Sequence, residues 1–538
     1  MPARPTPLIP PRGPRPRRFR TGAWTLAAGL ALAAPVPGRG AAPAIQVDGR
    51  PVSGMAQDDL GAAIRAFIQA PRFAAATWGI EVADLDTGRV LFAHNAGKYF
   101  IPASNAKLFT AAMALQELGP DRRLRTSLYA GAPPGPDGVL AGDLVLYGRG
   151  DPALLGPGTA GPFRPDPLED LARRLEALGV RAVQGDLVGD DSFFAAPPYG
   201  PGWEWEDLGA AYGAEPTALT VHRGTVDLWV YPAPGPGRPC FLFAQPGHGL
   251  FTFRNGTRTG PAQPVRAERL PGEEAIRVTG SLPPGAAPVR LTVSVRDPAR
   301  FAAQLLGRAL ARHGIQVRGR IRSAHYRDRP APPEAAGQVE LAGLEGPTVG
   351  ELVRDLLKRS DNLYAQCLLL QAGARPGPWA QAGDTARRGA AALAAWLAKA
   401  GLDPAAAALE DGAGLSRGDL VTPDALVRLL AHMDRQPEGR QFQADLPVAG
   451  VDGTLQRRLG GTPAQGNLRA KTGTLRFTRA LSGYLTDAGG ARLAFALLLN
   501  NYRPAPGAPP AEADLDTLAA LLARWPGSDG AGTPEAVN

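Results

Sequence analysis

The 538-residue sequence contains little of the residue types that hold metals or move protons. It has two cysteines, six histidines and, among 58 basic residues, only five lysines. Two cysteines exclude a Cys-rich zinc site, and the scattered histidines form no HExxH pair. Arginine suits ion pairs and solvated faces, but it does not lose its proton near neutral pH. A lysine is therefore informative wherever the chemistry requires a cation that can become a base.

The two cysteines allow two interpretations. Cys240 and Cys367 could form a disulfide in an oxidising compartment. Cys367 lies in the apolar helical run Tyr364–Leu370, which favours a buried free thiol instead.

Long hydrophobic runs are also absent, apart from one near the N-terminus. Residues 1–42 hold seven arginines and no acid, with the uncharged stretch Thr21–Gly38 inside them and small residues near Ala42. This pattern predicts a signal peptide over residues 1–42 and an exported, periplasmic or extracytoplasmic protein. Pro35 and Pro37 disfavour a spanning helix, so no stable transmembrane anchor is expected, with an uncleaved anchor as the alternative.

The charge of the chain gives no reason to expect a nucleic-acid partner. The formal net charge is +8. Removal of the seven arginines of residues 1–42 would leave about +1. A nearly neutral body lacks the basic surface that phosphate backbones require.

Hydrophobic patterning divides the rest of the chain into strand-rich and helix-rich regions. Residues 76–95 alternate around Asp86-Thr87-Gly88, which predicts a hairpin. Residues 120–330 are short apolar runs between Gly/Pro turns, which predicts one or two β-rich subdomains. A Pro- and Ala-rich linker follows at residues 327–338, and strand-like runs return after residue 470. Helical periodicity is predicted over residues 104–118, 168–178, 300–314, 349–372, 384–401, 423–434 and 511–524.

Strands at both ends of this region therefore bracket the helices, which fits one sheet assembled from both ends of the chain. The predicted fold class is α+β, with an antiparallel sheet flanked by helices and with inserted β-rich domains. The predicted domains are a catalytic domain of residues 45–119 and 340–525, an insertion of residues 120–330, and a disordered tail of residues 526–538.

Three short motifs carry the chemistry. They are Ser104-Asn105-Ala106-Lys107, Ser360-Asp361-Asn362 and Lys471-Thr472-Gly473-Thr474, in that order. From the composition, the joint chance of SxxK, SxN and KTG is on the order of 5 × 10⁻⁴. Each motif alone is weak, but the set is specific.

The first motif suits a serine nucleophile with an amine base. Pro102 precedes Ser104, so Ser104 is expected to open a helix and Lys107 to lie on the same face one turn later. A neutral Lys107 amine could then accept the Ser104 proton. The structural alternative is an N-cap serine followed by a surface lysine. No histidine accompanies Ser104, which disfavours a Ser-His-Asp triad.

The other two motifs have structural alternatives too. Ser360 and Asn362 lie at a turn-like helix end, where a second helix cap is the alternative. Lys471-Thr472-Gly473 begins an apolar run and predicts a strand edge, where Gly473 would let a substrate backbone lie close. A hairpin turn is the alternative there.

SxxK, SDN and KTG together mark the class A β-lactamases and penicillin-binding proteins. The chain resembles the low-molecular-mass class C penicillin-binding proteins, the D-alanyl-D-alanine carboxypeptidase/endopeptidase group. The long gap between Ser104 and Ser360, into which that group inserts β-rich domains, carries the resemblance. The segments at 142–154, 203–219, 411–423 and 446–458 extend it over nearly all of 45–525.

The resemblance implies a role for each motif residue. Ser104 would be the nucleophile, Lys107 its base, Ser360 the proton relay to the leaving D-Ala nitrogen and Asn362 a holder of the substrate amide. The remaining implied roles are an electrostatic partner of Ser360 (Lys471), carboxylate binding (Thr472 and Thr474) and an oxyanion hole from the backbone N–H groups of Ser104 and Thr474. The implied partners are peptidoglycan peptides and β-lactam antibiotics, and no metal or organic cofactor is implied.

Two further residues are predicted to bind the substrate side chain. Arg417 would pair with the carboxylate of a diamino acid in the stem peptide, and Asp191, in the loop 190–194, would receive its amino end. The alternative for Arg417 is an ion pair with Asp411 or Asp419. At the level of the whole protein, the alternatives are a serine β-lactamase and a non-catalytic penicillin-sensing or wall-binding module.

Overall fold

The computed structural model describes residues 46–47, 50–51, 60–154, 166–270, 272–328, 331–374 and 384–527. The predicted signal peptide, residues 1–42, and residues 528–538 of the predicted tail lie outside these ranges.

The central element is a five-stranded antiparallel sheet with the order β21-β22-β23-β3-β4. Its strands β3 (Thr77–Asp84) and β4 (Val90–His94) come from the start of the described chain, and form the predicted hairpin. The other three come from its end: β21 (Arg469–Leu475), β22 (Thr478–Thr486) and β23 (Arg492–Asn500). The prediction of one sheet built from both chain ends is confirmed.

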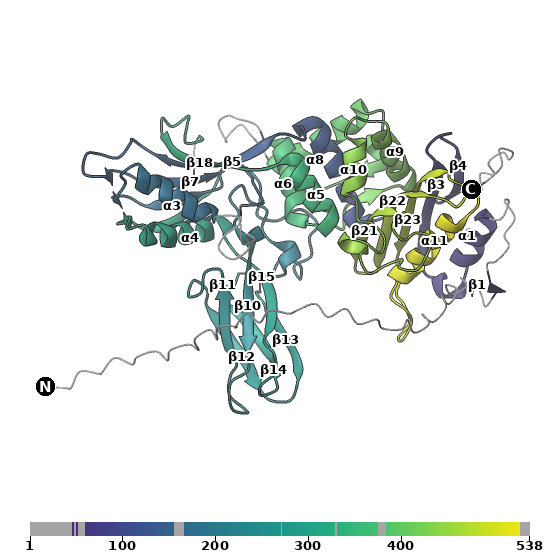
Figure 1. Ribbon diagram of the computed structural model, residues 1–538, viewed down its shortest axis with the longest axis horizontal. Helices are drawn as coiled ribbons and strands as arrows, with labels where there is room; N and C mark the ends of the chain where they lie inside the picture. The colour runs from purple at the N-terminus through teal and green to yellow at the C-terminus, as the bar shows by residue number, and fades with distance from the viewer. Residues whose placement is uncertain are drawn as a thin grey trace, which may run out of the picture. The chain divides into compact units, whose positions relative to one another are not determined.

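The two faces of this sheet are covered by different helices (Figure 1). On β23, Leu493, Phe495, Leu497 and Leu499 belong to a core with α1 (Leu60–Ile68) and α11 (Glu512–Arg524). The alternate residues, such as Ala494 and Ala496, belong to a second core with the remaining helices. Both faces of the strand are apolar because a strand that is covered on both sides must be hydrophobic throughout.

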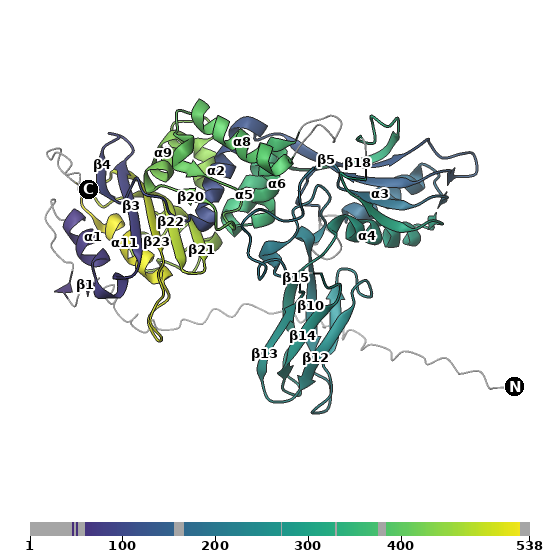
Figure 2. The same cartoon turned by 180° about the vertical axis from the view of Figure 1, so that it is seen from behind.

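The helical layer on the second face holds the largest core (Figure 2). It contains α2 (Ala106–Met113), which continues as a π-helical turn to Leu118, together with α5 (Val349–Arg359), α6 (Asn362–Gly373), α8 (Thr385–Lys399), α9 (Pro423–Asp434) and α10 (Gly439–Asp445). The short pair β19 (Ala407–Ala408) and β20 (Leu420–Val421) lies between α8 and α9 in the chain.

One predicted helix, residues 349–372, is in fact two helices. The chain breaks between α5 and α6 at Ser360, which has a left-handed φ of 59°. Asp361 then caps α6, because its carboxylate accepts the N–H of Tyr364 at 3.1 Å. Hydrophobic periodicity does not reveal this break, because α5 and α6 both contribute apolar residues to the same core.

The segment between the two halves of the central domain forms two further bodies. The first is a five-stranded sheet of order β17-β9-β7-β5-β18 that packs against two helices. Its elements are β5 (Arg123–Ala130), β7 (Leu144–Gly148), β9 (Leu187–Asp190), β17 (Ile321–Ala324), β18 (Val339–Thr348), α3 (Pro167–Ala177) and α4 (Pro298–Arg312), with a small sheet of β6 (Val139–Leu140), β8 (Ala182–Val183) and β16 (Gln316–Val317) beside them. The predicted helices at 168–178 and 300–314 are α3 and α4.

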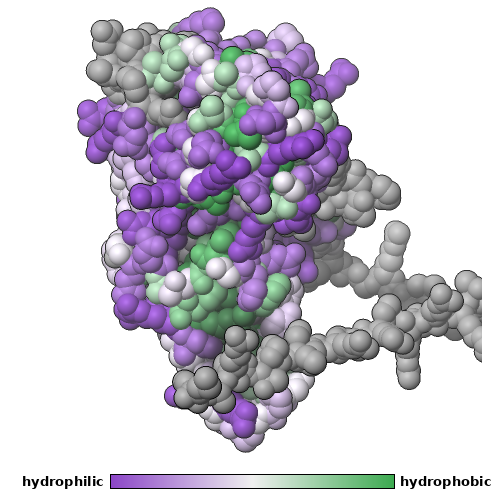
Figure 3. All heavy atoms as spheres, turned by 90° about the vertical axis from the view of Figure 1, so that its left-hand side faces the viewer, coloured by the Kyte–Doolittle hydropathy of each residue, from purple (hydrophilic) through white to green (hydrophobic). Residues whose placement is uncertain are grey.

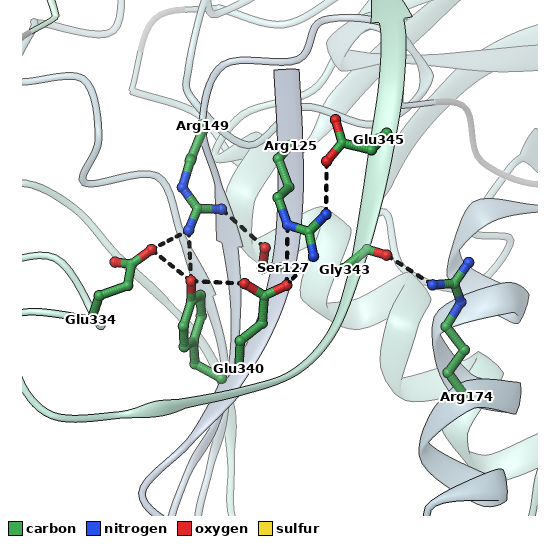
Figure 4. Close-up of polar contacts among 9 residues, drawn as sticks. Arg125, Ser127, Arg149, Arg174, Glu334, Glu340, Gly343 and Glu345 are labelled. Carbon is green, nitrogen blue, oxygen red and sulfur yellow. Dashed lines mark hydrogen bonds and ion pairs between the residues drawn. The ribbon is translucent and has the colours of Figure 1, made fainter. Parts of the chain in front are cut away.

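Strand β18 returns the chain from this body to the helical layer. It pairs with β5, and Glu345 lies opposite Arg125 in the register. Arg125 donates to Glu345 at 2.7 Å and to Glu340 at 3.1 Å, while Arg149 contacts Glu334 nearby (Figure 4). The inserted sheet therefore includes residues up to Thr348, and the helical layer resumes at Val349.

The second inserted body is a sandwich of two three-stranded sheets. One is β11 (Phe241–Gln245), β10 (Thr225–Tyr231) and β15 (Val289–Ser294), and the other is β12 (Phe253–Thr259), β14 (Ile276–Leu282) and β13 (Gln263–Glu268). Val226, Leu228 and Val230 of β10 are fully buried and share a core with Ile276 and Val278 of β14.

Two of the sequence-based questions have direct answers here. Cys240 and Cys367 are both buried free thiols and do not form a disulfide.

Among the described helices, none combines the length and the hydrophobicity needed to cross a membrane. Two strands of two residues each, β1 (Gln46–Val47) and β2 (Arg50–Pro51), pair with each other and precede α1 in the chain.

Candidate active site

Ser104 lies in a tight turn at the start of α2. Ala103, Ser104 and Asn105 form a 3₁₀ turn that leads into the helix, and Ala103 has a left-handed φ of 48°. A non-glycine residue with positive φ is held there only by its surroundings, and Ala103 is fully buried. The side chain of Asn105 donates to the Ser482 hydroxyl of β22 at 2.7 Å, which ties the turn to the central sheet.

Lys107 follows one turn later and reaches back to the serine. Its Nζ lies 2.8 Å from Ser104 Oγ, 2.7 Å from Asn362 Oδ1 and within hydrogen-bond distance of the Ala413 carbonyl. The side chain is fully buried. A neutral amine has two N–H groups and one lone pair. If the amide and carbonyl oxygens accept the two N–H groups, the lone pair is left for the Ser104 hydroxyl.

Electrostatics favour that neutral form. Burial lowers the pKa of the Lys107 amine to about 8, while nearby carboxylates oppose the shift. Those carboxylates belong to Asp411, Asp361 and Asp419. Lys107 therefore exchanges its proton close to neutral pH, which a surface lysine does not do.

The loop that supplies the Ala413 carbonyl is organised by Asp411. This buried carboxylate accepts backbone N–H groups at 2.6–3.2 Å from four successive residues, 413–416. It also accepts the indole N–H of Trp203 at 2.6 Å. Gly414 has a φ of 74° and no room for a Cβ, because such an atom would overlap the Ala103 carbonyl oxygen. The loop therefore packs directly on the turn that carries Ser104.

The second motif occupies the break between α5 and α6. Asn362 Oδ1 accepts from Lys107, and its Nδ2 donates to the Tyr212 carbonyl at 2.8 Å. Ser360 Oγ accepts from Lys471 Nζ at 2.8 Å. Because Ser360 is left-handed, its side chain turns out of the helical path toward β21.

Lys471 is the second buried amine of the site. It also donates to the Thr472 carbonyl at 2.7 Å. Burial lowers the pKa of Lys471 well below its usual value, and the nearby Lys107 lowers it further. The charge of Lys107 thus disfavours a charged Lys471, and each amine contacts a different serine.

The third motif, Lys471-Thr472-Gly473-Thr474, lies on strand β21, and its residues point to both faces of the strand. Thr472 and Thr474 line the cleft that holds Ser104, and Thr472 Oγ1 lies 2.8 Å from Thr454 Oγ1. Gly473 points the other way, where an added Cβ would lie 2.8 Å from the Pro102 carbonyl oxygen. The glycine is therefore required by the approach of β21 to the serine turn rather than by contact with the cleft.

The three motifs meet in one cleft of about 780 Å³. Its walls include residues from the central sheet, the helical layer and the inserted segment. The lining residues are Ser104, Glu204, Glu206, Asp207, Tyr212, Ser360, Asn362, Gly414, Leu415, Arg417, Thr454, Arg458, Thr472, Thr474, Leu475, Arg476, Arg479 and Glu512.

Arg417 lies in this cleft, but its ion-pair partner was not foreseen. It pairs with Glu204 at 3.3 Å and donates to the Arg476 carbonyl at 3.0 Å. Neither Asp411 nor Asp419 is a partner, because both carboxylates turn inward to backbone N–H groups.

Asp191 is not brought together with the other site residues. It lines a separate pocket of about 420 Å³ at the end of β9, where its carboxylate accepts from His325 at 2.8 Å. The acidic residues that do line the cleft are Glu204, Glu206 and Asp207. Asp191 therefore does not line the cleft, whereas these three acids from the segment at 203–219 do.

Several contributors were missed as individual residues. Ala413 supplies its carbonyl to Lys107, Tyr212 supplies its carbonyl to Asn362, and Thr454 contacts Thr472. All three lie in the segments 203–219, 411–423 and 446–458 that carry the family resemblance. The signal was present in those segments, but two of the three contributors are backbone carbonyls, which have no side-chain signature.

An antiparallel sheet flanked by helices, with a buried serine–lysine pair beside Ser-x-Asn and Lys-Thr-Gly, defines the class of penicillin-recognising serine hydrolases. Within that class, the chain belongs to the D-Ala-D-Ala carboxypeptidase 3 (S13) family, whose model matches residues 60–522.

Individual relatives agree with this assignment. A D-alanyl-D-alanine carboxypeptidase of Actinomadura sp. (strain R39) is 35% identical over 534 residues, which cover 95% of this chain and 93% of the relative. The D-alanyl-D-alanine carboxypeptidase DacB of Haemophilus influenzae is 26% identical over 439 residues, covering 79% and 85%. The crystal structure of penicillin binding protein 4 (dacB) from Haemophilus influenzae superimposes with a TM-score of 0.72 at 25% identity, covering 84% of this chain and 96% of that one.

Proposed function

We propose that this protein is a serine D-Ala-D-Ala carboxypeptidase and D,D-endopeptidase that cleaves peptidoglycan stem peptides and cross-links through an acyl-enzyme on Ser104. The observation that carries the proposal is the contact of 2.8 Å between Ser104 Oγ and a fully buried Lys107 amine whose pKa is lowered to about 8 by burial. A hydroxyl next to an amine with a free lone pair is an activated nucleophile.

In the acylation step, Ser104 Oγ attacks the carbonyl carbon of the penultimate D-Ala and passes its proton to Lys107. The oxyanion is stabilised by the backbone N–H groups of Ser104 and Thr474. The peptide C–N bond then breaks, and the proton that Lys107 took from Ser104 passes to the leaving nitrogen through the Ser360 hydroxyl, which Lys471 contacts at 2.8 Å. Both reactions leave an ester on Ser104. The carboxypeptidase reaction releases free D-Ala, and the endopeptidase reaction releases the second stem peptide with a free amine.

In the deacylation step, Lys107 takes a proton from a water molecule that attacks the ester carbonyl. The acyl bond to Ser104 Oγ then breaks, and Lys107 passes the proton to that oxygen. Asn362 holds the substrate amide, a role supported by its position at the cleft between Lys107 and the Tyr212 carbonyl. Thr472 and Thr474 bind the terminal carboxylate, and Gly473 keeps β21 close to the serine turn. The chemistry requires no metal or organic cofactor.

The wall that holds Arg417 is suited to a zwitterionic side chain. Arg417 presents a guanidinium for a carboxylate, and Glu206 is an exposed acid on the same cleft for an ammonium. A diamino acid in the stem peptide, bearing both groups beyond the reacting carbonyl, fits this pair. The nearby Glu204 holds Arg417 in place and would exchange its partner when the substrate binds.

The same acylation step leads to covalent binding of β-lactams, because their strained amide enters the same site. Peptidoglycan lies outside the cytoplasm, and the export signal proposed for residues 1–42 would take the protein there. A chain lacking residues 1–42 should be active but retained in the cytoplasm, whereas full-length protein recovered from membranes would favour an uncleaved anchor.

The proposed activity is tested by incubating purified protein with a stem pentapeptide ending in D-Ala-D-Ala and with its D-Ala-L-Ala counterpart. We expect release of D-Ala from the first substrate only. A cross-linked muropeptide dimer, analysed by mass spectrometry, measures the endopeptidase reaction. Rapid hydrolysis of penicillin without peptide cleavage would indicate a β-lactamase, and acylation without any turnover would indicate a sensing module.

A further inference from the structure

A second cavity, of about 760 Å³, opens beside the catalytic cleft. Tyr212, Ser360 and Asn362 line both spaces, so the two are continuous beside Ser360, the residue proposed to pass a proton to the leaving nitrogen. The cavity lies between the helix break that carries Ser360 and one face of the inserted β10–β15 sheet. We call this cavity the leaving-side groove.

The sheet wall of the groove is polar and charged. Arg290 donates to Asp227 at 2.6 Å, and Thr292 donates to the same carboxylate at 2.7 Å. The Arg290 guanidinium also lies 5.9 Å from the centre of the Trp229 ring. These residues face the groove because side chains alternate along a strand, and their neighbours Val226 and Leu228 are buried in the sandwich core.

Further along the same face the sheet becomes aromatic. Trp229 lies opposite Phe243, and Tyr231 lies opposite Phe241, so four aromatic residues occupy two cross-strand positions. The Phe243 ring also stacks on His248, with 4.8 Å between the ring centres. Tyr231, Phe243 and Phe241 are 40%, 41% and 61% exposed. We call these four residues the aromatic strip. Hydrophobic residues are exposed among hydrophilic ones at the level of this sheet, in the lower half of Figure 3.

Exposed aromatic residues in paired rows are unusual on a protein surface, because each ring gains by burial. Their flat, rigid faces suit the flat apolar faces of sugar rings, while adjacent charged groups suit a peptide. The strip begins where the groove ends, at Trp229, which lines the groove. A ligand that extends from the catalytic cleft along the groove would therefore reach the aromatic strip.

We propose that the leaving-side groove and the aromatic strip together bind the leaving half of a cross-linked peptidoglycan substrate, with its stem peptide in the groove and its sugar rings on the strip. This inference rests on the proposed function. Asp227 and Tyr231 are four residues apart on β10, or ~13 Å. An extended peptide of about four residues, which spans up to ~14 Å, can follow this length of the sheet.

The inserted sandwich thus determines substrate size rather than chemistry. A monomeric pentapeptide releases only D-Ala and needs neither the groove nor the strip. A cross-linked dimer releases a whole stem peptide with its disaccharide and gains binding energy from both. Variants of this surface should therefore separate the two reactions.

The test compares kcat/KM on four substrates: a disaccharide-bearing cross-linked dimer, the same dimer without sugars, a monomeric pentapeptide, and labelled penicillin. The double variant Tyr231→Ser with Phe241→Ser should lose at least about fivefold on the first substrate only. Arg290→Ala should lose about fivefold on both dimers and stay within about twofold on the other two. Leu178→Ser, an exposed apolar residue beyond α3, is the matched control.

Each outcome decides the proposal. Unchanged cleavage of the disaccharide-bearing dimer by the double variant, or equal losses on the pentapeptide, would overturn it. Equal losses on both dimers would overturn the assignment of sugars to the strip. A wild-type protein that cleaves the pentapeptide but no dimer would overturn the inference and leave the carboxypeptidase intact. Failure of the proposed function itself is distinct, because neither penicillin nor pentapeptide would then react. Thermal unfolding of each variant checks that the fold is retained.

Discussion

The catalytic cleft and the pocket around Asp191 both contain buried ionisable groups, yet they differ in how charge is compensated. In the cleft, the Lys107 amine contacts neutral oxygens, and burial lowers its pKa to about 8. In the other pocket, His325 contacts the Asp191 carboxylate directly, and this hydrogen bond raises the His325 pKa to about 9. Burial without a directly paired counter-ion produces a base, whereas a matched pair produces a stable ion pair.

The comparison also shows why acidic and aromatic content alone did not identify a residue of the cleft. The segment 190–194 has the expected composition, but it lies at the end of β9 in the inserted sheet. There Asp191 is held by His325 and by a backbone contact with Ala324.

Replacement of the nucleophile should give the largest effect. Ser104→Ala should abolish labelling by penicillin, because the variant lacks the hydroxyl that contacts the Lys107 amine, while the thermal unfolding curve should be unchanged. The measurement is labelled-penicillin binding followed by peptide mapping. Labelling that persists in the variant would show that another residue is the nucleophile.

Replacement of the base should be nearly as severe. Lys107→Arg keeps a positive charge but cannot accept the serine proton, so kcat/KM should fall at least tenfold, or ~1.4 kcal/mol. Lys399→Arg, at an exposed lysine that pairs with Glu117, is the matched control and should be neutral. An active Lys107 variant would leave the identity of the base open to another group.

The pH dependence should follow the same amine. Because burial lowers the pKa of Lys107 to about 8, the neutral, reactive fraction grows as pH rises through that value. The acylation rate should therefore increase about tenfold between pH 7 and pH 9 and then level off. Stopped-flow acylation measures this profile, and a rate that falls over the same range contradicts a neutral lysine base.

The effect of removing the Arg417 guanidinium on kcat/KM should depend on the substrate. Arg417→Ala should lower kcat/KM about tenfold for a diaminopimelate-bearing peptide but by less than about twofold for benzylpenicillin acylation, which lacks that carboxylate. Arg327→Ala, in the Asp191 pocket, is the matched control. Equal losses with both substrates, together with a lower melting temperature, would make Arg417 structural.

The smallest effect is expected at the ion pair of the second pocket. Because the folded-state pKa of His325 is raised to about 9, its stabilisation is complete below the unfolded value near 6.5 and is lost as pH rises through 9. His325→Gln should lower the free energy of unfolding by about 1 kcal/mol or less at pH 6, because the imidazole is partly exposed. The variant should match wild type at pH 10, and its penicillin acylation should be unchanged.

Much of this protein follows from the sequence alone. The helices at 168–178, 300–314, 384–401 and 423–434, and the sheet built from both chain ends, are patterns of hydrophobic period that neighbouring residues largely determine. The three motifs likewise contain the serine and both lysines that the structure brings together, because a motif is a pattern of side chains. The scarcity of lysine made Lys107 and Lys471 conspicuous.

Other features depend on contacts between distant segments. The left-handed Ser360, the Ala413 carbonyl on Lys107 and the pairing of Arg417 with Glu204 each join residues far apart in the chain. The same holds for the requirement for glycine at 473, which comes from the Pro102 carbonyl. Local sequence determines which side chains can do chemistry and which segments can form helices or strands. Tertiary packing alone decides which backbone carbonyls and which charges meet, because those contacts depend on how separate elements dock.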